Sequence, residues 1–307
     1  MLFGCGAPHT RQVDSTIPNP APYVTPAGDK IIFLDDYYTG YLKAVRLNFK
    51  KNDSLLDARA FAPIHKRYFL KSGNSVDRNP NTSFTIHDTT GLDDIIAGIE
   101  TNKAQIERLI TSELADCRGY LKNDSLTFYI SPSSQDMKKI LKGLGGVSSW
   151  AISKKNIIIM IDPRISTWSE MLQYNIAHDY SHTFCWDKMN LGALLAMNLL
   201  DRVVAEGKAD AFAHLLYPDV KCPWDTALSA EETQYQWSRI KMEMRSEEYY
   251  QIQGIMFGSD NYPAWTGYNV GYEIVQSALK NNPALTPEQW TNQSPAWILD
   301  ASDYKAK

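Results

Sequence analysis

The sequence predicts an α+β fold that is mainly helical, with a small β-sheet before a helix at residues 166–186. From about residue 30, apolar residues recur at intervals of three and four, which is the spacing of one buried helix face. Between residues 125 and 162 this pattern gives way to two short β-branched and aromatic runs, which are typical of strands. The length of 307 residues and the hydrophobic fraction of 44% are ordinary for a globular protein. We expect a single domain over residues 30–307.

The N-terminal part of this domain, residues 30–120, is expected to be helical. A first helix is predicted over 34–49, and a second helix ends near Leu70. The polar stretch at 71–83 is expected to be a loop. Residues 89–117 carry regularly spaced isoleucines and leucines, and predict a long amphipathic helix.

The predicted sheet follows this helical part. The runs SLTFYIS (125–131) and NIIIMID (156–162) are bounded by polar residues or proline and predict two strands. Residues 136–144 between them predict a short helix. Residues 145–153 are compatible with a loop or with an edge strand to which a peptide could pair.

Four helices are expected after the sheet. They cover residues 166–186, 191–217, about 230–253 and 268–282. The second of them would make roughly seven turns at the α-helical period. No internal repeat and no clear linker interrupts the chain after residue 30.

The first 29 residues are expected to be a tether with a lipid anchor. In MLFGCG a small residue precedes Cys5, as at the end of a bacterial lipoprotein signal, although the basic and long apolar parts of such a signal are missing. Five prolines between Pro8 and Pro26 favour an extended segment. These features predict a cell-envelope lipoprotein, periplasmic or in the outer membrane, anchored through Cys5. A cytoplasmic protein with a disordered start is the alternative.

Composition argues against two further kinds of partner. The formal net charge is −4 and no stripe of Lys and Arg is present, so nucleic acid is not an expected partner. No apolar run is long enough to span a membrane, which leaves Cys5 as the expected membrane contact. If Cys5 is acylated, Cys117, Cys185 and Cys222 allow at most one internal disulfide, with Cys185 and Cys222 as the candidate pair.

A metal-binding pattern lies in NIAHDYSHTF, residues 175–184. His178 and His182 are four positions apart, which places their side chains about 40° apart around a helix. Both imidazoles can therefore reach one cation at the roughly 2.0–2.1 Å that zinc requires. Asp179 projects beside this pair, where a metal-activated water would lie.

The next helix contains two acids in VVAEGKADAF, residues 203–212. Glu206 offers an oxygen ligand, and Asp210, one turn later, can accept the free N–H of a ligating histidine, with His178 as the candidate. The apolar neighbours make this an unusual place for two acids without a partner. Three protein ligands leave one position for water, as in catalytic zinc sites.

This arrangement, HxxxH followed by ExxxD, resembles that of gluzincins, the thermolysin-type metallopeptidases. The segments AHDYSHTF, LLDRVVAEGKADAFA and WTGYNVGYEIV, in this order, also resemble a bacterial family of predicted zinc-dependent proteases, some of them lipoproteins. The similarity covers roughly residues 120–285. It implies a zincin-like domain with zinc on His178, His182 and Glu206, and with Asp210 supporting a ligand from behind.

The resemblance also implies peptide hydrolysis, with the residue after the first histidine as the general base. The family has glutamate there, whereas this chain has Asp179, which is one methylene shorter. A displacement of about 1 Å can lower a rate by on the order of 10²-fold. The chain could therefore be a slow peptidase, a peptidase re-spaced to suit aspartate, or an inactive zinc-binding pseudo-peptidase that binds peptides in the cell envelope.

The block GYNVGY offers a candidate for stabilising the oxyanion. Tyr268 or Tyr272 could donate a phenolic hydrogen bond to the oxygen on which charge develops, and the family that the chain resembles keeps this block, which favours Tyr268. The alternative is that Tyr268 and Tyr272 fill the core while Gly267 and Gly271 allow close helix packing.

A second enzyme class shares part of the pattern. The dipeptides at His178–Asp179 and His87–Asp88 resemble the His-Asp pairs of metal phosphohydrolases. That class does not explain the spacing of the acids in the next helix. His214 is about 12 Å along that helix from Glu206, so it is expected to be structural.

Overall fold

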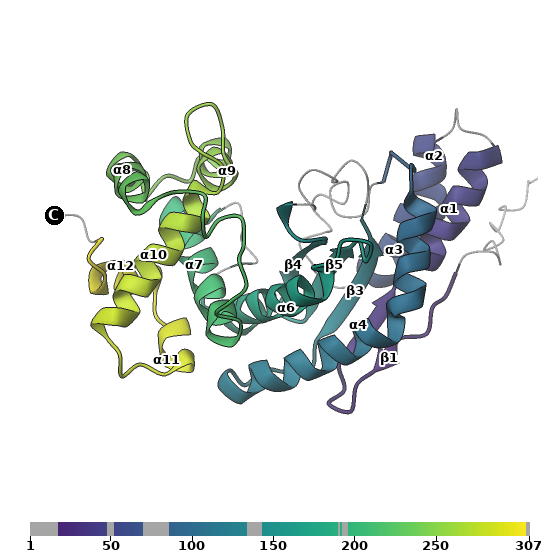
Figure 1. The fold of residues 1–307 in the computed structure, drawn as a ribbon, viewed down its shortest axis with the longest axis horizontal. Helices are drawn as coiled ribbons and strands as arrows, with labels where there is room; N and C mark the ends of the chain where they lie inside the picture. Colours follow the sequence, from purple (N-terminus) through teal and green to yellow (C-terminus); the bar gives the residue numbers. More distant parts are fainter. Residues whose placement is uncertain are drawn as a thin grey trace, which may run out of the picture.

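The computed structural model describes residues 18–47, 52–69, 86–133, 143–189, 191 and 196–304 (Figure 1). Cys5, the predicted loop at 71–83 and most of the predicted helix at 136–144 lie outside these residues. The elements in chain order are β1 (Tyr23–Val24), β2 (Lys30–Phe33), α1 (Asp35–Leu47), α2 (Asn52–Leu56), the π-helix η2 (Asp57–Phe61), α3 (Ala62–Ile64), the π-helix η3 (His65–Phe69), α4 (Leu92–Tyr120), β3 (Thr127–Pro132), β4 (Val147–Ser153), β5 (Asn156–Ile161), α6 (Trp168–Cys185), α7 (Leu199–Leu216), α8 (Ala230–Ile240), the 3₁₀-helix η7 (Lys241–Glu243), α9 (Tyr249–Phe257), α10 (Thr266–Asn281), α11 (Pro287–Thr291) and α12 (Pro295–Ala301).

A mixed sheet of five strands precedes the long helix α6. Its order is β1-β2-β3-β5-β4, with β2, β3 and β5 parallel and the edge strands β1 and β4 antiparallel. β3 and β5 lie where strands are predicted, and residues 145–153 contain the edge strand β4 rather than a loop. β1 and β2 were not predicted. The apolar run that forms β2 is too short for its periodicity to distinguish a strand from a helix.

The folded part begins before residue 30, because β1 lies inside the segment expected to be a tether. Asp29 fixes the turn between β1 and β2. Its buried carboxylate accepts hydrogen bonds from Arg118 Nη1 and Nη2 at 2.9 and 2.6 Å, and from the Leu126 N–H at 2.8 Å. The ends of α4 and β3 are thereby joined to the N-terminal hairpin.

Alternate residues of the strands enter two apolar cores on opposite faces of the sheet. Ile31 and Ile157 belong to the larger core, which contains the buried faces of α4, α6 and α7. Ile32 and Ile158 belong to the smaller core, which contains α1 and the helical segment 52–69. Burial on both faces explains the unbroken apolar runs of the central strands. The prediction of a mainly helical α+β fold is confirmed.

α7 begins at Leu199, later than predicted from the apolar pattern. Asn198 caps it, since the Asn198 side chain accepts a hydrogen bond from the Asp201 N–H at 3.0 Å and the Asp201 side chain accepts one in return. The short helices α11 and α12 were not predicted. Thr286 caps α11 with the same reciprocal pair of hydrogen bonds, whereas the Ser294 side chain caps α12 by accepting one from the Trp297 N–H.

The helix expected at 230–253 is interrupted, since α8 ends at Ile240 and α9 begins at Tyr249. The linking segment supports the first turn of α7. The Met244 carbonyl accepts a hydrogen bond from the Leu200 N–H at 3.0 Å, one of the N–H groups that a helix start leaves without an intrahelical partner.

Glycines allow α10 to approach α7 and α9 very closely. A Cβ on Gly271 would lie 2.1 Å from the Val203 carbonyl oxygen, and a Cβ on Gly207 would lie 2.2 Å from that of Gly271. On the other side, a Cβ on Gly267 would lie 2.3 Å from Met256 Sδ. The close packing considered for Gly267 and Gly271 is therefore present, and it holds α10 directly against the helix that carries Glu206.

The cysteine side chains of the described residues form no disulfide. Cys117, Cys185 and Cys222 are all buried and free, so the candidate pair Cys185–Cys222 was wrong. Cys185 packs in a small apolar cluster with Met189 at the end of α6, whereas Cys222 belongs to the larger core.

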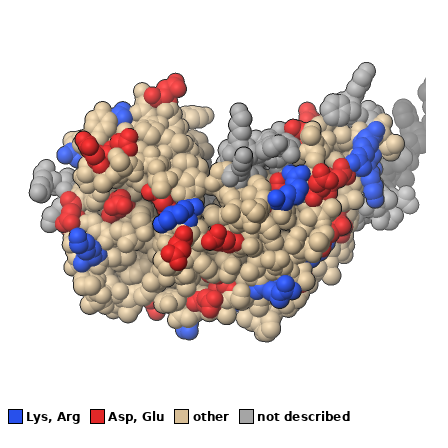
Figure 2. All heavy atoms as spheres, in the orientation of Figure 1, with Lys and Arg blue, Asp and Glu red and all other residues tan. Residues whose placement is uncertain are grey.

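Acidic and basic side chains are interspersed on the face shown in Figure 2, without a large patch of one sign. None of the described helices combines the length and the apolar character that a membrane span needs.

A buried carboxyl group joins α4 to the end of α7. Glu113, which is fully buried, accepts hydrogen bonds from the Tyr217 hydroxyl and from Cys117 Sγ. Gln173 Nε2 donates to the Tyr217 hydroxyl at 3.1 Å, which adds α6 to the network. Burial raises the pKa of Glu113 to about 8.

Substituting Glu113 by glutamine is expected to flatten the pH dependence of stability. Since its pKa is about 8 when folded and about 4.5 when exposed, the folded state binds the extra proton between these values. The free energy of unfolding should therefore fall as pH rises from about 4.5 to 8, by at most about 1.4 kcal/mol per pH unit. Denaturant unfolding at pH 5 and pH 8 measures this change in the free energy of unfolding. Glu100→Gln, an exposed substitution on α4, is the control; an equal slope in Glu113→Gln and the parent would contradict the assignment.

Candidate metal centre

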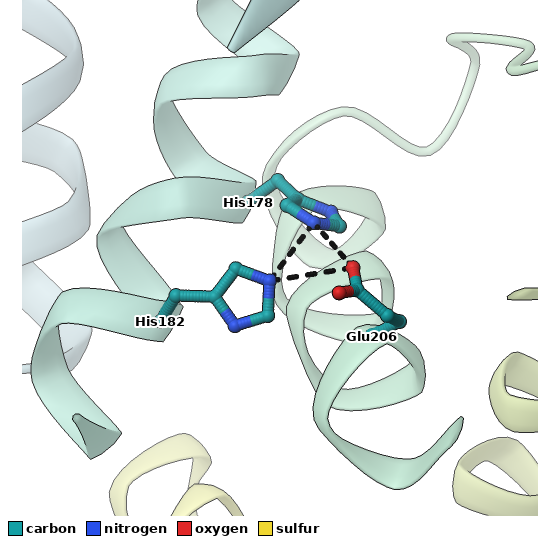
Figure 3. Close-up of side chains that lie close together, drawn as sticks. All are labelled: His178, His182 and Glu206. Atoms are coloured by element: carbon teal, nitrogen blue, oxygen red, sulfur yellow. Dashed lines mark hydrogen bonds and ion pairs between the residues drawn. The ribbon is translucent and has the colours of Figure 1, made fainter. Parts of the chain in front are cut away.

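The principal candidate site lies between α6 and α7. α6 presents His178 and His182 one turn apart, and α7 presents Glu206 toward them (Figure 3). His178 Nε2 lies 3.1 Å from His182 Nε2 and 3.2 Å from Glu206 Oε2. His182 Nε2 lies 3.4 Å from the same carboxylate oxygen. The structure thus brings the three predicted ligands together at one point.

These three atoms fit a zinc ion. Ligand atoms about 2.0–2.1 Å from a tetrahedral zinc are about 3.3–3.4 Å apart, and the separations here are 3.1–3.4 Å. Two imidazole nitrogens and one carboxylate oxygen form a donor set of catalytic zinc sites. Within the described part of the chain, no fourth His, Cys, Asp or Glu joins the three. The arrangement therefore leaves the open position that a catalytic metal needs.

Asp210 lies directly behind His178. Its Oδ1 is 2.9 Å from His178 Nδ1 and accepts a hydrogen bond from the Tyr174 hydroxyl at 3.1 Å. A carboxylate in this place holds the imidazole proton on Nδ1, which leaves Nε2 free to bind a metal and fixes the orientation of the ring. Asp210 thus lies where the helical spacing places it. Tyr174 was missed, because a tyrosine on a buried helix face is indistinguishable in sequence from core packing.

The buried acids set the charge of the two histidines. Burial alone would lower the pKa of His178, but the charge and hydrogen bond of Asp210, together with Glu206, raise it to about 9. The pKa of His182 is likewise raised, since the charge of Glu206 outweighs burial. Burial opposes ionisation of Glu206, but His182 and His178 hold its pKa well below the usual range. A metal must displace protons from such histidines, so its affinity should weaken as pH falls.

Asp210→Asn is expected to lower zinc affinity by about 10–100-fold, the usual cost of losing a carboxylate behind a ligating histidine. The amide keeps the shape but removes the charge that orients His178. Competition with a chromophoric chelator measures the affinity. Tyr174→Phe, which removes one hydrogen bond and retains the carboxylate, should have a smaller effect. An unchanged affinity in Asp210→Asn would show that Asp210 does not support the site.

Asp179 is a residue of α6, and its side chain faces the edge strand β4. Its side chain is 2% exposed. Oδ1 accepts a hydrogen bond from the Ala151 N–H at 2.9 Å, and Oδ2 accepts one from the Ser149 hydroxyl. Burial raises the pKa of Asp179 despite the opposing charges of the nearby histidines, and a raised pKa suits a carboxylate that accepts a proton near neutral pH. The role of Ser149 had no signal in the sequence, since only the sheet brings β4 to this carboxylate.

A cleft of about 730 Å³ opens beside His178. One side is formed by Ser148, Ser149 and Trp150 of β4, and the other by aromatic residues before and within α10. In Figure 2 the surface is hollowed between the part that carries α8–α10 and the part that carries β4. The volume is in the range of small-ligand sites.

Tyr268 lines this cleft, as a residue that contacts a substrate should. Burial raises the pKa of its hydroxyl well above the usual value, and the charges of Glu206 and Asp210 raise it further. The phenol therefore remains protonated and can donate a hydrogen bond. Tyr272, in contrast, lies in a separate cavity with His214, and their ring centroids are 5.1 Å apart.

The other histidines considered from the sequence lie outside the metal site. His214 Nε2 is 3.1 Å from Asp225 Oδ1, consistent with a structural role. His87 Nδ1 is 3.0 Å from Asp53 Oδ1 at an exposed position. The dipeptide at His87–Asp88 therefore contributes no ligand to the group formed by α6 and α7.

One comparison with known proteins gave a match. Residues 106–300 match the model of a family described as predicted Zn-dependent protease. Searches of curated proteins and of solved structures returned no significant match. The matched span is more than half of the chain and contains α6, α7 and α10, with every candidate ligand. The chain therefore belongs to this family of predicted zinc-dependent proteases.

Proposed function

We infer that the protein is a zinc metallopeptidase that hydrolyses peptide bonds. The observation that carries this proposal is the convergence of His178 Nε2, His182 Nε2 and Glu206 Oε2, within 3.1–3.4 Å of one another, beside an open cleft. Two nitrogens, one carboxylate oxygen and a remaining position are what metal-assisted hydrolysis requires. The described cleft is large enough for a peptide segment.

Each residue around the site has a distinct role in the proposed hydrolysis. Zinc, when bound, supplies Lewis-acid chemistry, which polarises a peptide carbonyl and makes water a nucleophile near neutral pH. Asp179 accepts the proton of the attacking water and delivers it to the leaving amine. Tyr268 donates its hydroxyl proton in a hydrogen bond to the oxygen on which charge develops. Asp210 holds the imidazole of His178 in the required orientation.

Metal removal tests this function. We expect purified protein to contain close to one zinc per chain, to release fragments from a mixed peptide pool, and to lose this activity on chelation. Stoichiometric zinc should restore it. Metal content by mass spectrometry and product detection by liquid chromatography are the measurements. Activity that survives complete removal of the metal would contradict the proposal.

The second candidate is a zinc-binding protein that holds peptides without cutting them, at the cell envelope if Cys5 carries a lipid. One observation favours it: both carboxylate oxygens of Asp179 already accept hydrogen bonds from β4. Such a carboxylate could serve to join α6 to β4 instead of moving protons. Peptide binding without hydrolysis by the zinc-loaded protein would identify this function. Neither candidate involves nucleic acid.

A further inference from the structure

The cleft beside His178 has an unusual composition. The described residues that line it include no Lys, Arg, Asp or Glu, and its polar groups are neutral apart from the His178 ring. Substrate binding in this cleft therefore depends on shape, apolar area and neutral hydrogen bonds. A charged side chain entering it would lose water without meeting a counter-ion among these lining residues, which is unfavourable.

Four aromatic rings form one side of this cleft; we call them the aromatic wall. They are Trp224, Phe257, Trp265 and Tyr268. The ring centroid of Tyr268 lies 5.2 Å from that of Trp224 and 5.4 Å from that of Trp265. Phe257 completes the group at 5.7 Å from Tyr268 and 5.9 Å from Trp265. These separations are those of favourable aromatic pairs. The side chain of Phe257 nevertheless remains 47% exposed.

The backbone holds Trp265 in a conformation that bulky residues rarely adopt. Its φ of 64° is the one positive value among the described non-glycine residues. The preceding turn is closed by the Ser259 N–H, which donates to the Tyr262 carbonyl at 2.9 Å. Arg239 supports the same turn, with its guanidinium 4.6 Å from the centre of the Tyr262 ring. A strained residue kept in place at the edge of a candidate active site is typical of a functional constraint.

Trp224 is also positioned before any substrate binds. Asn269 Nδ2 donates to the Trp224 carbonyl at 3.1 Å, and Asn269 Oδ1 accepts from the Thr233 hydroxyl at 2.6 Å. α8 and α10 thus fix the segment that carries Trp224. The Trp224 side chain is itself buried, so it has little rotamer freedom to lose on binding, which favours affinity.

We propose that the aromatic wall is the specificity subsite of this protein and binds a large apolar side chain of the peptide, preferably an aromatic one. This inference rests on the proposed peptidase function. The wall lies in the same cleft as the metal ligand His178, so the recognised residue is next to the bond that is cut. Lysine, arginine, aspartate and glutamate are disfavoured at that position.

Two measurements test the proposal. The first is the cleavage profile of the zinc-loaded protein on a proteome-derived peptide library, scored for residues enriched at fixed positions around the cut. The second requires no catalysis: ligand-observed NMR compares binding of N-acetyl-phenylalaninamide, N-acetyl-alaninamide and N-acetyl-lysinamide. We expect phenylalanine to exceed alanine by at least about tenfold, as apolar pockets typically discriminate.

Variants of one helix provide the matched control. Phe257→Ala removes a ring of the wall, whereas Tyr250→Ala removes an 84% exposed ring of the same helix that does not line the cleft. Trp265→Asn removes a second ring and accepts the positive φ, because asparagine tolerates this conformation. The preference for phenylalanine should fall several-fold in Phe257→Ala and Trp265→Asn, and should persist in Tyr250→Ala.

The outcomes separate this proposal from the peptidase function. Cleavage without enrichment of large apolar residues would overturn the subsite and leave the peptidase intact. Selective binding without cleavage would support the subsite and contradict the peptidase. A preference that both wall variants retain would overturn the assignment to these rings. Absence of both selective binding and selective cleavage would also overturn it.

Discussion

Glu206→Gln is expected to remove zinc from the protein and to abolish peptide hydrolysis. Glu206 Oε2 is the only carboxylate oxygen of the three converging donor atoms, 3.2 and 3.4 Å from the two imidazole nitrogens. Glutamine keeps the shape but offers a neutral oxygen, so the site loses the negative charge that offsets the metal. Because changes behind a ligand cost about 10–100-fold in affinity, loss of a direct ligand should cost more than about 100-fold. Zinc content after dialysis and peptide cleavage measure the two effects.

Glu170→Gln is the matched control for this prediction. It makes the same change of charge on α6, at an exposed position. It should retain one zinc and the parent activity. His182→Ala should behave as Glu206→Gln does, since it removes another of the three donors. Full zinc retention in both Glu206→Gln and His182→Ala would disprove the metal centre.

Asp179→Asn is expected to lower kcat by on the order of 10²–10⁴-fold with zinc content unchanged, which is the usual contribution of a general base. The amide fits the same space and its oxygen can still accept the hydrogen bond from the Ala151 N–H. It cannot accept a proton from water. Single-turnover cleavage of a fluorogenic peptide, with zinc quantified in the same sample, separates the loss of the base from the loss of the metal.

Glutamate at position 179 tests whether the site is adapted to the shorter acid. The Asp179 carboxylate is buried and both its oxygens are bonded to β4, so an additional methylene has to displace these contacts. We therefore expect Asp179→Glu to be no more active than the parent. A higher rate in Asp179→Glu would show that aspartate is an impaired base. An unchanged rate in Asp179→Asn would remove Asp179 from catalysis. Asp187→Asn, exposed beyond the end of α6, is the control.

The convergence of the candidate ligands was predictable because helical periodicity relates sequence spacing directly to geometry. Residues four apart on a helix lie on one side, which is sufficient to pair His178 with His182 and Glu206 with Asp210. The long helices were predictable for the same reason. The bounds of α7 were not, because its apolar pattern continues beyond the cap formed by Asn198 and Asp201. Strand β2 was missed because a short apolar run fits either type of element. Strand β1 was missed because its two residues lie in the proline-rich segment that was expected to be a tether.

The surroundings of the metal site depend on contacts between segments that are distant in the chain. Ser149 donates a hydrogen bond to Asp179 only because β4 is the edge strand beside α6. Tyr174 on α6 donates one to Asp210 on the neighbouring helix α7. No local spacing encodes such pairs, since each requires the sheet order and the helix packing to be known.

The sequence alone therefore determined the helical character, the resemblance to the family and the three candidate metal donors, because each follows from residues close together in the chain or from a recognisable order of segments. Only the tertiary structure decided how Asp179 is held and which rings line the cleft. Both depend on long-range packing, in which glycines 207 and 271 set the distance between α7 and α10. Tyr268 lies on α10, and together with the rings of Trp224, Phe257 and Trp265 it lines the cleft that also contains His178.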